Sequence, residues 1–334
     1  MRDHLEVLFG LGADYAVGPT LLSEFVPGRL RGVLLGSLTV LWTVGHVLAN
    51  VLGTYIPING TTAYWLLASG ALPALLVLLL RIGIPESPSW LAARRRGAEA
   101  ARIRRTYLGQ SEATATATAA DAEAAAAAQP PAARYRELFA RGQATKTWFG
   151  VIFYSAQVLP YFAIYTFMPQ ILAALNISGA DTQNLVLNLA LLLGGVIGLW
   201  PVQRLGRRPF TIGTFAILTL CPGAMAVLSE GSGGALMVPF LIYTFVMAGA
   251  STITQVYPAE LFPTALRGSG VGFLNGTSRV ASAIGTFVLP VSLSHFGAGW
   301  SMGWMALVLL LGTAVSLAWA PETRDTLTAE DPHH

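Results

Sequence analysis

Charged residues are scarce in this chain of 334 residues: only 11% are Asp, Glu, Lys or Arg, whereas 54% are hydrophobic. A soluble domain carries about 25% charged residues, so this deficit predicts an integral membrane protein. The mean hydropathy of +0.58 agrees with that class.

Side chains for metal and covalent chemistry are scarce as well. One cysteine, Cys221, excludes a disulfide framework and a cysteine-based metal site, and the five histidines are dispersed along the chain. The sequence contains no HExxH motif, no Ser/His/Asp constellation and no glycine-rich loop followed by Lys. We therefore expect no metal, no cofactor and no enzymatic activity.

Apolar segments are what the chain does contain. A bilayer-spanning helix needs roughly 20 mostly apolar residues, and nine segments approach this length. They are 5–25, 33–56, 63–84, 148–173, 185–201, 209–228, 235–257, 270–296 and 302–320. The sequence therefore predicts an all-α polytopic membrane protein with nine transmembrane helices.

The basic residues orient these helices. Alternate connections carry Lys or Arg, including ten within 85–147, whereas the connections 57–62, 174–184, 229–234 and 297–301 carry none. By the positive-inside rule, the basic connections are cytoplasmic. This places the N-terminus outside and the C-terminus in the cytoplasm, and it explains the pI near 9.2 without a nucleic-acid partner.

A change in composition divides the chain into four parts. Residues 1–85 form a three-helix group, and residues 148–323 form a six-helix bundle. Between them, 86–147 is a cytoplasmic linker with an Ala/Thr tract of low complexity, either helical or disordered, which we interpret as a tether. Residues 324–334 form a cytoplasmic tail.

An internal repeat follows two of the apolar segments. Glu24, Pro27 and Arg31 recur in the same order and spacing as Glu260, Pro263 and Arg267. Repeats of helix groups are typical of secondary transporters. Three further motifs are PESPSWL at 85–91, RLGRRP at 204–209 and PETR at 321–324.

With these five motifs in family order, the sequence resembles the major facilitator superfamily, in its sugar-porter-like or metabolite:proton symporter branch. The resemblance implies a helix bundle of that type. It would make the nine helices numbers four to twelve of twelve, so that the first three are lacking here.

Charged side chains at cytoplasmic depth are candidates for a gate. A carboxylate and an arginine there pair while the mouth is closed and separate when it opens. The candidates are Glu24, Arg31, Arg204, Arg207, Glu260, Arg267, Glu322 and Arg324. The alternative is that individual arginines only anchor the topology. Gln203 departs from the Asp that family members usually carry.

Asp14 and Arg279 lie inside apolar segments, where a charge is costly and usually faces a cavity or a partner. The stretch around Asp14 and Tyr15 resembles a signature of phosphate:proton symporters, although Ala13 and Ala16 depart from it. In those symporters the Asp is implicated in proton coupling or substrate binding. The alternative role for either charge is a buried ion pair.

The SRVASAIG stretch around Arg279 resembles that of organic-ion and nicotinate symporters, in which the arginine is associated with the substrate's negative charge. A guanidinium binds a carboxylate or phosphate with two hydrogen bonds. On segment 148–173, Tyr154, Gln157, Tyr161 and Tyr165 share one helix face because they recur every three or four residues.

We predict that Asp14, Tyr15, Gln157, Tyr161 and Arg279 bind the substrate, with Asp14 carrying the coupling proton. The resulting hypothesis is a proton-coupled secondary transporter of a small organic anion in the inner membrane, working by alternating access, and N-terminally truncated. The alternatives are a phosphate or sugar transporter of the same superfamily, or a non-transporting membrane fragment or sensor. The oligomeric state stays open.

Overall fold

The computed structural model describes residues 21–22, 24–26, 28–56, 59–128, 135–140, 142–174, 180–229, 233–262 and 264–322. Regular structure in these residues is helical throughout. The chain divides into two compact units, one of residues 1–38 and 52–132 and the other of residues 39–51 and 133–334. Each unit is described by itself.

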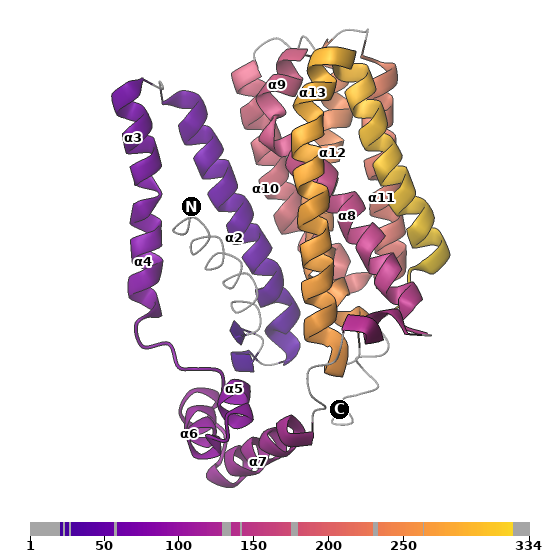
Figure 1. Ribbon diagram of the computed structural model, residues 1–334. Coiled ribbons are helices and arrows are strands. Elements are labelled where there is room, and N and C mark those ends of the chain that lie inside the picture. The colour runs from indigo at the N-terminus through magenta and orange to yellow at the C-terminus, as the bar shows by residue number, and fades with distance from the viewer. Residues whose placement is uncertain are drawn as a thin grey trace. The chain divides into compact units, whose positions relative to one another are not determined.

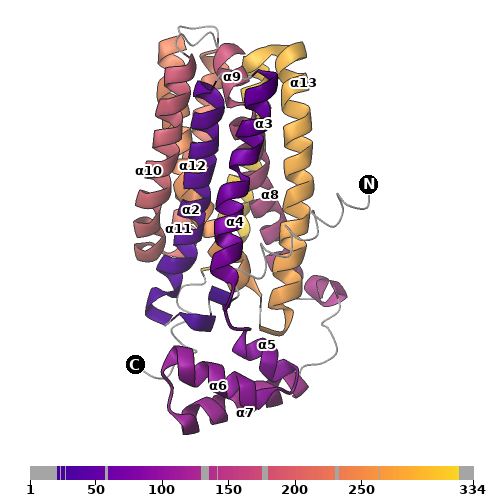
Figure 2. The ribbon, with the colours of Figure 1, turned by 90° about the vertical axis from the view of Figure 1, so that its left-hand side faces the viewer.

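The second unit is a helix bundle, in which the long helices run side by side (Figures 1 and 2). It holds residues 39–51 of α2 (Gly28–Tyr55), the short 3-10 helix η1 (Tyr135–Phe139), α8 (Ala144–Thr166), α9 (Met168–Ala174), α10 (Ala180–Arg204), α11 (Arg207–Val227), α12 (Gly233–Leu261) and α13 (Thr264–Trp319). Large buried side chains such as Phe149, Phe215 and Tyr243 fill its core.

Helix α13 consists of two arms that meet at Gly297. The φ of Gly297 is +80°, in the left-handed region that glycine enters without a Cβ clash. Figure 1 shows the chain reversing direction between the orange and yellow arms. The hydroxyls of Ser292 and Ser301 lie 2.8 Å apart and join the arms across this turn. The two arms correspond to the predicted segments 270–296 and 302–320.

Helices α10 and α12 approach closely where glycines face each other. A Cβ built on Gly198 would lie 2.3 Å from the Cα of Gly249, and one built on Gly194 would lie 2.1 Å from the carbonyl oxygen of Phe245. Small residues of this kind allow membrane helices to pack backbone against backbone. Close packing therefore holds these two helices in register.

The described residues hold seven candidate membrane spans: 36–54, 62–81, 144–166, 182–202, 207–227, 234–258 and 268–319. The last is 52 residues long and includes both arms of α13. The predicted all-helical membrane class is confirmed. The first predicted segment, 5–25, lies mostly outside the described residues, and the number of nine helices stays a prediction.

Two predicted segments are each built from two helices. Residues 63–84 divide into α3 (Gly60–Ser69) and α4 (Ala71–Arg81), and residues 148–173 divide into α8 and α9 at Phe167. Hydropathy did not reveal these breaks, because the apolar character continues across both of them.

The predicted linker contains three packed helices of the first unit, α5 (Pro88–Ala93), α6 (Gly97–Leu108) and α7 (Glu112–Ala128). Leu91, Ala92, Ala100 and Ala119 form their small core, and Figure 1 shows them gathered into one group. The Ala/Thr tract is thus helical over 112–128. The domain limits that we read from composition stay a proposal.

Candidate functional site

Buried polar side chains line up on α8. Tyr154, Gln157, Tyr161 and Tyr165 are each less than 9% exposed, and Gln157 is only 2% exposed. Neither amide atom of Gln157 has a hydrogen-bond partner among the described residues. Leaving such a buried group unpaired costs about 1–3 kcal/mol. Gln157 therefore offers a donor and an acceptor to a bound molecule.

Two of the four side chains form hydrogen bonds with neighbouring helices. The Tyr154 hydroxyl donates to Oδ1 of Asn275 on α13 at 3.0 Å, and the Tyr165 hydroxyl donates to the carbonyl oxygen of Thr244 on α12 at 3.3 Å. These bonds give Tyr154 and Tyr165 a structural role. Gln157 and Tyr161, the pair preferred from the sequence, lie between them on the same face.

Residues 39–51 of α2 add aromatic rings to this face. Trp42 lies 5.7 Å from Tyr161 between ring centroids, and Tyr161 lies 4.6 Å from Tyr165. His46 stacks on Trp42 and meets the edge of Tyr165. We define Trp42, His46, Tyr161, Phe162 and Tyr165 as the aromatic cluster. Trp42 and His46 were not among the predicted binding residues, although their four-residue spacing places both on one helix face.

Arg279 reaches the aromatic cluster from α13. Its guanidinium carbon lies 5.2 Å from the centroid of the Phe162 ring, which is cation–π geometry. Trp42 lies 6.4 Å from the same ring. The structure thus connects Arg279 with Tyr161 through Phe162 and Trp42. Asp14 and Tyr15 lie outside the described residues, so their part in the site stays a prediction.

Three asparagines join α2 to α10. Oδ1 of Asn50 accepts hydrogen bonds from the side-chain amides of Asn184, at 2.8 Å, and Asn188, at 3.1 Å. Asn184 and Asn188 are only 4% and 1% exposed. Hydrogen bonds between amides join helices inside a bilayer, so this asparagine cluster holds α2 against the bundle.

A charged network gathers at the start of α11 and the ends of α12 and α13. Arg207 forms a double hydrogen bond with Glu260, with Nη2–Oε1 at 3.2 Å and Nε–Oε2 at 3.3 Å. Their side chains are 15% and 8% exposed. Glu322 accepts the backbone N–H groups of Arg207 and Arg208 at 2.8 and 3.2 Å. Of the eight gate candidates, the structure brings together these three: Arg207, Glu260 and Glu322.

Glu24 lies in the first unit and has a separate set of partners. The Ser87 hydroxyl donates to its carboxylate at 2.6–2.7 Å, and the backbone N–H of Ser89 donates at 3.2 Å. Ser87 also accepts the Trp90 N–H and so caps α5. Ser87 lies in the PESPSWL motif, and its pairing with Glu24 was not predicted.

The positions of the other gate candidates do not test a gating role. Arg204 is exposed at the end of α10. The side chains of Arg31 and Arg267, and the whole of Arg324, lie outside the described part of the structure. Their gating role stays a prediction.

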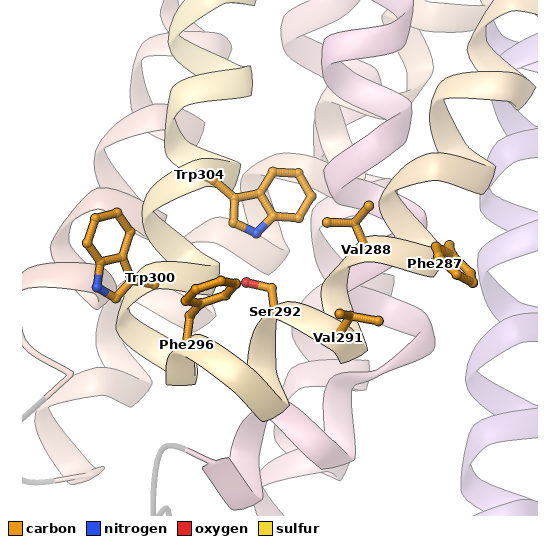
Figure 3. Close-up of a pocket in the computed structure, with 7 residues that line it drawn as sticks. All are labelled: Phe287, Val288, Val291, Ser292, Phe296, Trp300 and Trp304. Carbon is orange, nitrogen blue, oxygen red and sulfur yellow. The ribbon is translucent and has the colours of Figure 1, made fainter.

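An open pocket of about 440 Å³ lies on α13 around Gly297, lined by Phe287, Val288, Val291, Ser292, Phe296, Trp300 and Trp304. Figure 3 shows the indole nitrogen of Trp304 turned toward Ser292. The lining carries no charged group, so this pocket is not the site predicted for an anion. Within the described residues, no group of three or more His, Cys, Asp or Glu side chains could hold a metal ion.

A helix bundle with repeated motifs and an intramembrane arginine defines a membrane transporter. Residues 7–330 match the profile of the family described as "Sugar (and other) transporter". The chain belongs to this family of the major facilitator superfamily. It is an integral membrane protein, and the prediction that it is not an enzyme is confirmed by the family.

Two relatives and one solved structure illustrate the match. The inner membrane metabolite transport protein YgcS of Escherichia coli K12 is 39% identical over 94% of this chain and 69% of its own length. The niacin transporter NiaP of Acinetobacter baylyi is 28% identical over 94% and 71%. The xylose transporter XylE of E. coli, in a partially occluded inward-open conformation, superposes with a TM-score of 0.75 at 20% identity, over 94% of this chain and 69% of that one.

Proposed function

We propose that this chain is a proton-coupled secondary transporter of a small organic anion, working by alternating access. The observation that carries the proposal is the position of Arg279, whose guanidinium stacks on Phe162 at the aromatic cluster. Position 279 lies inside a membrane span. Because a charge at that depth is costly, it favours a polar cavity or an anionic ligand as its surroundings.

The shape of the substrate follows from the cluster. Trp42, Tyr161 and Tyr165 present ring faces and edges on which a planar molecule can stack. Gln157 supplies an unpaired amide one helical turn away from Tyr161. An aromatic or planar carboxylic acid satisfies both features, and the relative NiaP is named for niacin, a pyridine carboxylic acid.

Asp14 is the group we assign to the coupling proton, with Tyr15 beside it at the substrate. The cytoplasmic gate would use the network of Arg207, Glu260 and Glu322, which is held by hydrogen bonds that can break and re-form. We place the protein in the inner membrane, as the name of YgcS supports. The N-terminus as given would lie outside and the C-terminus in the cytoplasm.

Uptake into proteoliposomes tests this function. Labelled nicotinate, benzoate, xylose and phosphate are offered with an inward proton gradient and with equal pH on both sides. We expect accumulation of an aromatic acid that rises with the gradient and is abolished in Asp14→Asn. Accumulation of xylose or phosphate in place of the acids would establish the alternative substrate classes. Uptake of an acid that is indifferent to the gradient would contradict proton coupling.

A further inference from the structure

We infer that His46 is a proton-binding site in the contact between α2 and α8, and that its protonation loosens this contact. The inference deepens the proposed function and rests on it. It adds a second protonation site to the one assigned to Asp14, at a place where two helices meet.

The imidazole of His46 is half-buried between two aromatic rings. It stacks on Trp42 with 5.9 Å between the ring centroids and 18° between the planes. It meets Tyr165 of α8 edge to face, at 6.2 Å and 77°. A change in the charge of His46 therefore acts directly on the contact between α2 and α8.

Few other groups in the described spans titrate near neutral pH. The seven spans contain no Asp or Glu, and the only imidazoles in them are His46 and His295. His295 is exposed and pairs with the hydroxyl of Ser294 at 2.9 Å. Histidine is the side chain whose ordinary pKa places its charge change between pH 5 and 8. Within these spans, His46 is thus the half-buried group suited to a proton at physiological pH.

The titratable and charged groups near His46 come from α8 and α13. Tyr165 of α8 meets the imidazole directly, Tyr161 contacts Tyr165 and Trp42, and Arg279 of α13 lies on Phe162. Helix α10 bonds to α2 through the side-chain amides of Asn184 and Asn188, which do not titrate. The seven described spans contain no carboxylate side chain.

These neighbours permit both charge states of His46 but do not favour them equally. The face of Trp42 attracts an imidazolium through its π electrons. Partial burial opposes the charged form, because it removes water from the ring. Protonation therefore favours an arrangement in which α2 separates from α8 and water reaches the ring.

The asparagine cluster lies on α2 one turn beyond His46. Asn50 bonds to Asn184 and Asn188, so the same face of α2 is held at 42, 46 and 50 by successive contacts. By the topology assigned above, this end of α2 is the outer one. Loosening the contact at His46 would thus open the bundle toward the side from which protons enter.

Histidine-selective ¹⁵N NMR of the full chain in lipid nanodiscs tests proton binding without any substrate. Five histidines give few signals, and His46→Gln identifies the one that belongs to His46. We expect this signal to titrate between pH 5 and 8. A His46 signal that keeps one tautomer and one shift from pH 4.5 to 8.5 would overturn the proposal.

Thiol labelling tests the link to helix contact. Val47 is 9% exposed on α2, and Cys221, the only native cysteine, is replaced by Ala. The alkylation rate of Val47→Cys is measured at each pH in a protein that keeps His46 and in one that also carries His46→Gln. Dividing the first rate by the second cancels the pH dependence of the thiol itself. We expect the alkylation rate of the protein with His46, divided by that of the His46→Gln protein, to rise about fivefold from pH 7.5 to 5.5, because protonation shifts the population toward the loosened contact. A constant ratio would contradict the loosening.

His295→Gln is the matched control, because it removes an exposed imidazole outside the contact. It should leave both the His46 titration and the alkylation ratio unchanged. Uptake of nicotinate in the same proteoliposomes separates this inference from the proposed function. If no acid is accumulated while the His46 signal titrates, the transport proposal fails and the proton site stands. Gradient-driven uptake with a His46 signal that does not titrate overturns the proton site alone.

Discussion

The carboxylate of Glu322 accepts a hydrogen bond of 2.8 Å from the backbone N–H of Arg207, the first residue of α11. Gly206, the N-cap residue, has no side chain to serve this end of the helix. Glu322 comes 115 residues later in the sequence and performs the capping role from another part of the fold. It thereby joins the end of α13 to the start of α11.

Removing this cap should destabilise the bundle. Glu322→Ala leaves the N–H groups of Arg207 and Arg208 without their acceptor, and loss of an N-cap costs about 0.5–2 kcal/mol. We expect a lower melting temperature of the detergent-solubilised protein. Glu322→Gln keeps an acceptor oxygen but loses the charge at the helix N-terminus, so its loss should be smaller. Equal melting temperatures for wild type and Glu322→Ala would refute the capping role.

Breaking the pair of Arg207 and Glu260 should cost more than removing an exposed charge. Both side chains are largely buried. Removing one of them takes away the charge that this pair supplies to the other, which lowers the free energy of unfolding by about 2 kcal/mol or more. We expect Glu260→Gln and Arg207→Gln each to lower unfolding stability, and the double variant to lose less than their sum. Arg136→Gln, at an exposed position on η1, is the control. Strictly additive losses would show that the two side chains do not interact energetically.

A methyl group at Gly198 should disrupt the contact between α10 and α12. Its Cβ would lie 2.3 Å from the Cα of Gly249, and overpacking of this kind costs about 1–3 kcal/mol. Gly213→Ala on α11 is a matched control, because nothing lies within 4 Å of its built Cβ. We expect Gly198→Ala to melt at a lower temperature and Gly213→Ala to melt at the wild-type temperature or above. A stable Gly198→Ala protein would contradict the close approach.

Gln157→Leu separates binding from stability. Because the Gln157 amide has no partner in the described residues, its replacement by an apolar group of similar size should be neutral or stabilising by about 1 kcal/mol. Uptake of the acid should nevertheless fall. Asn188→Leu provides the contrast, since it removes an amide bonded to Asn50 and should destabilise the protein. A large loss of stability in Gln157→Leu would show that this amide is structural.

The membrane helices were predictable from the sequence because a bilayer imposes a length and an apolar character on every span. The connection predicted at 297–301 coincides with the turn at Gly297. The same argument did not reveal the break at Phe167, because it depends on backbone angles that apolar composition does not encode. The helicity of 112–128 was left open because alanine favours a helix while threonine and low complexity do not decide it.

The site was predictable only in part. Arg279 and Gln157 could be chosen as candidates because a charge or an amide in an apolar segment is conspicuous; their role in binding stays a prediction. His46 and Asn50 were not chosen, because the role of a single imidazole or amide depends on the side chains that contact it in the folded chain. The pairing of Glu24 with Ser87, 63 residues apart, likewise follows from folding and not from local pattern.

The most direct test of the central claim compares the uptake of nicotinate with that of its neutral isostere nicotinamide. Both are measured in proteoliposomes of the wild type, Arg279→Lys and Arg279→Gln. The two ligands differ mainly in the carboxylate that Arg279 would bind with two hydrogen bonds. We predict that the wild type prefers the acid, that Arg279→Lys retains part of this preference, and that Arg279→Gln loses it. An Arg279→Gln protein that still accumulates nicotinate and excludes nicotinamide would contradict the account.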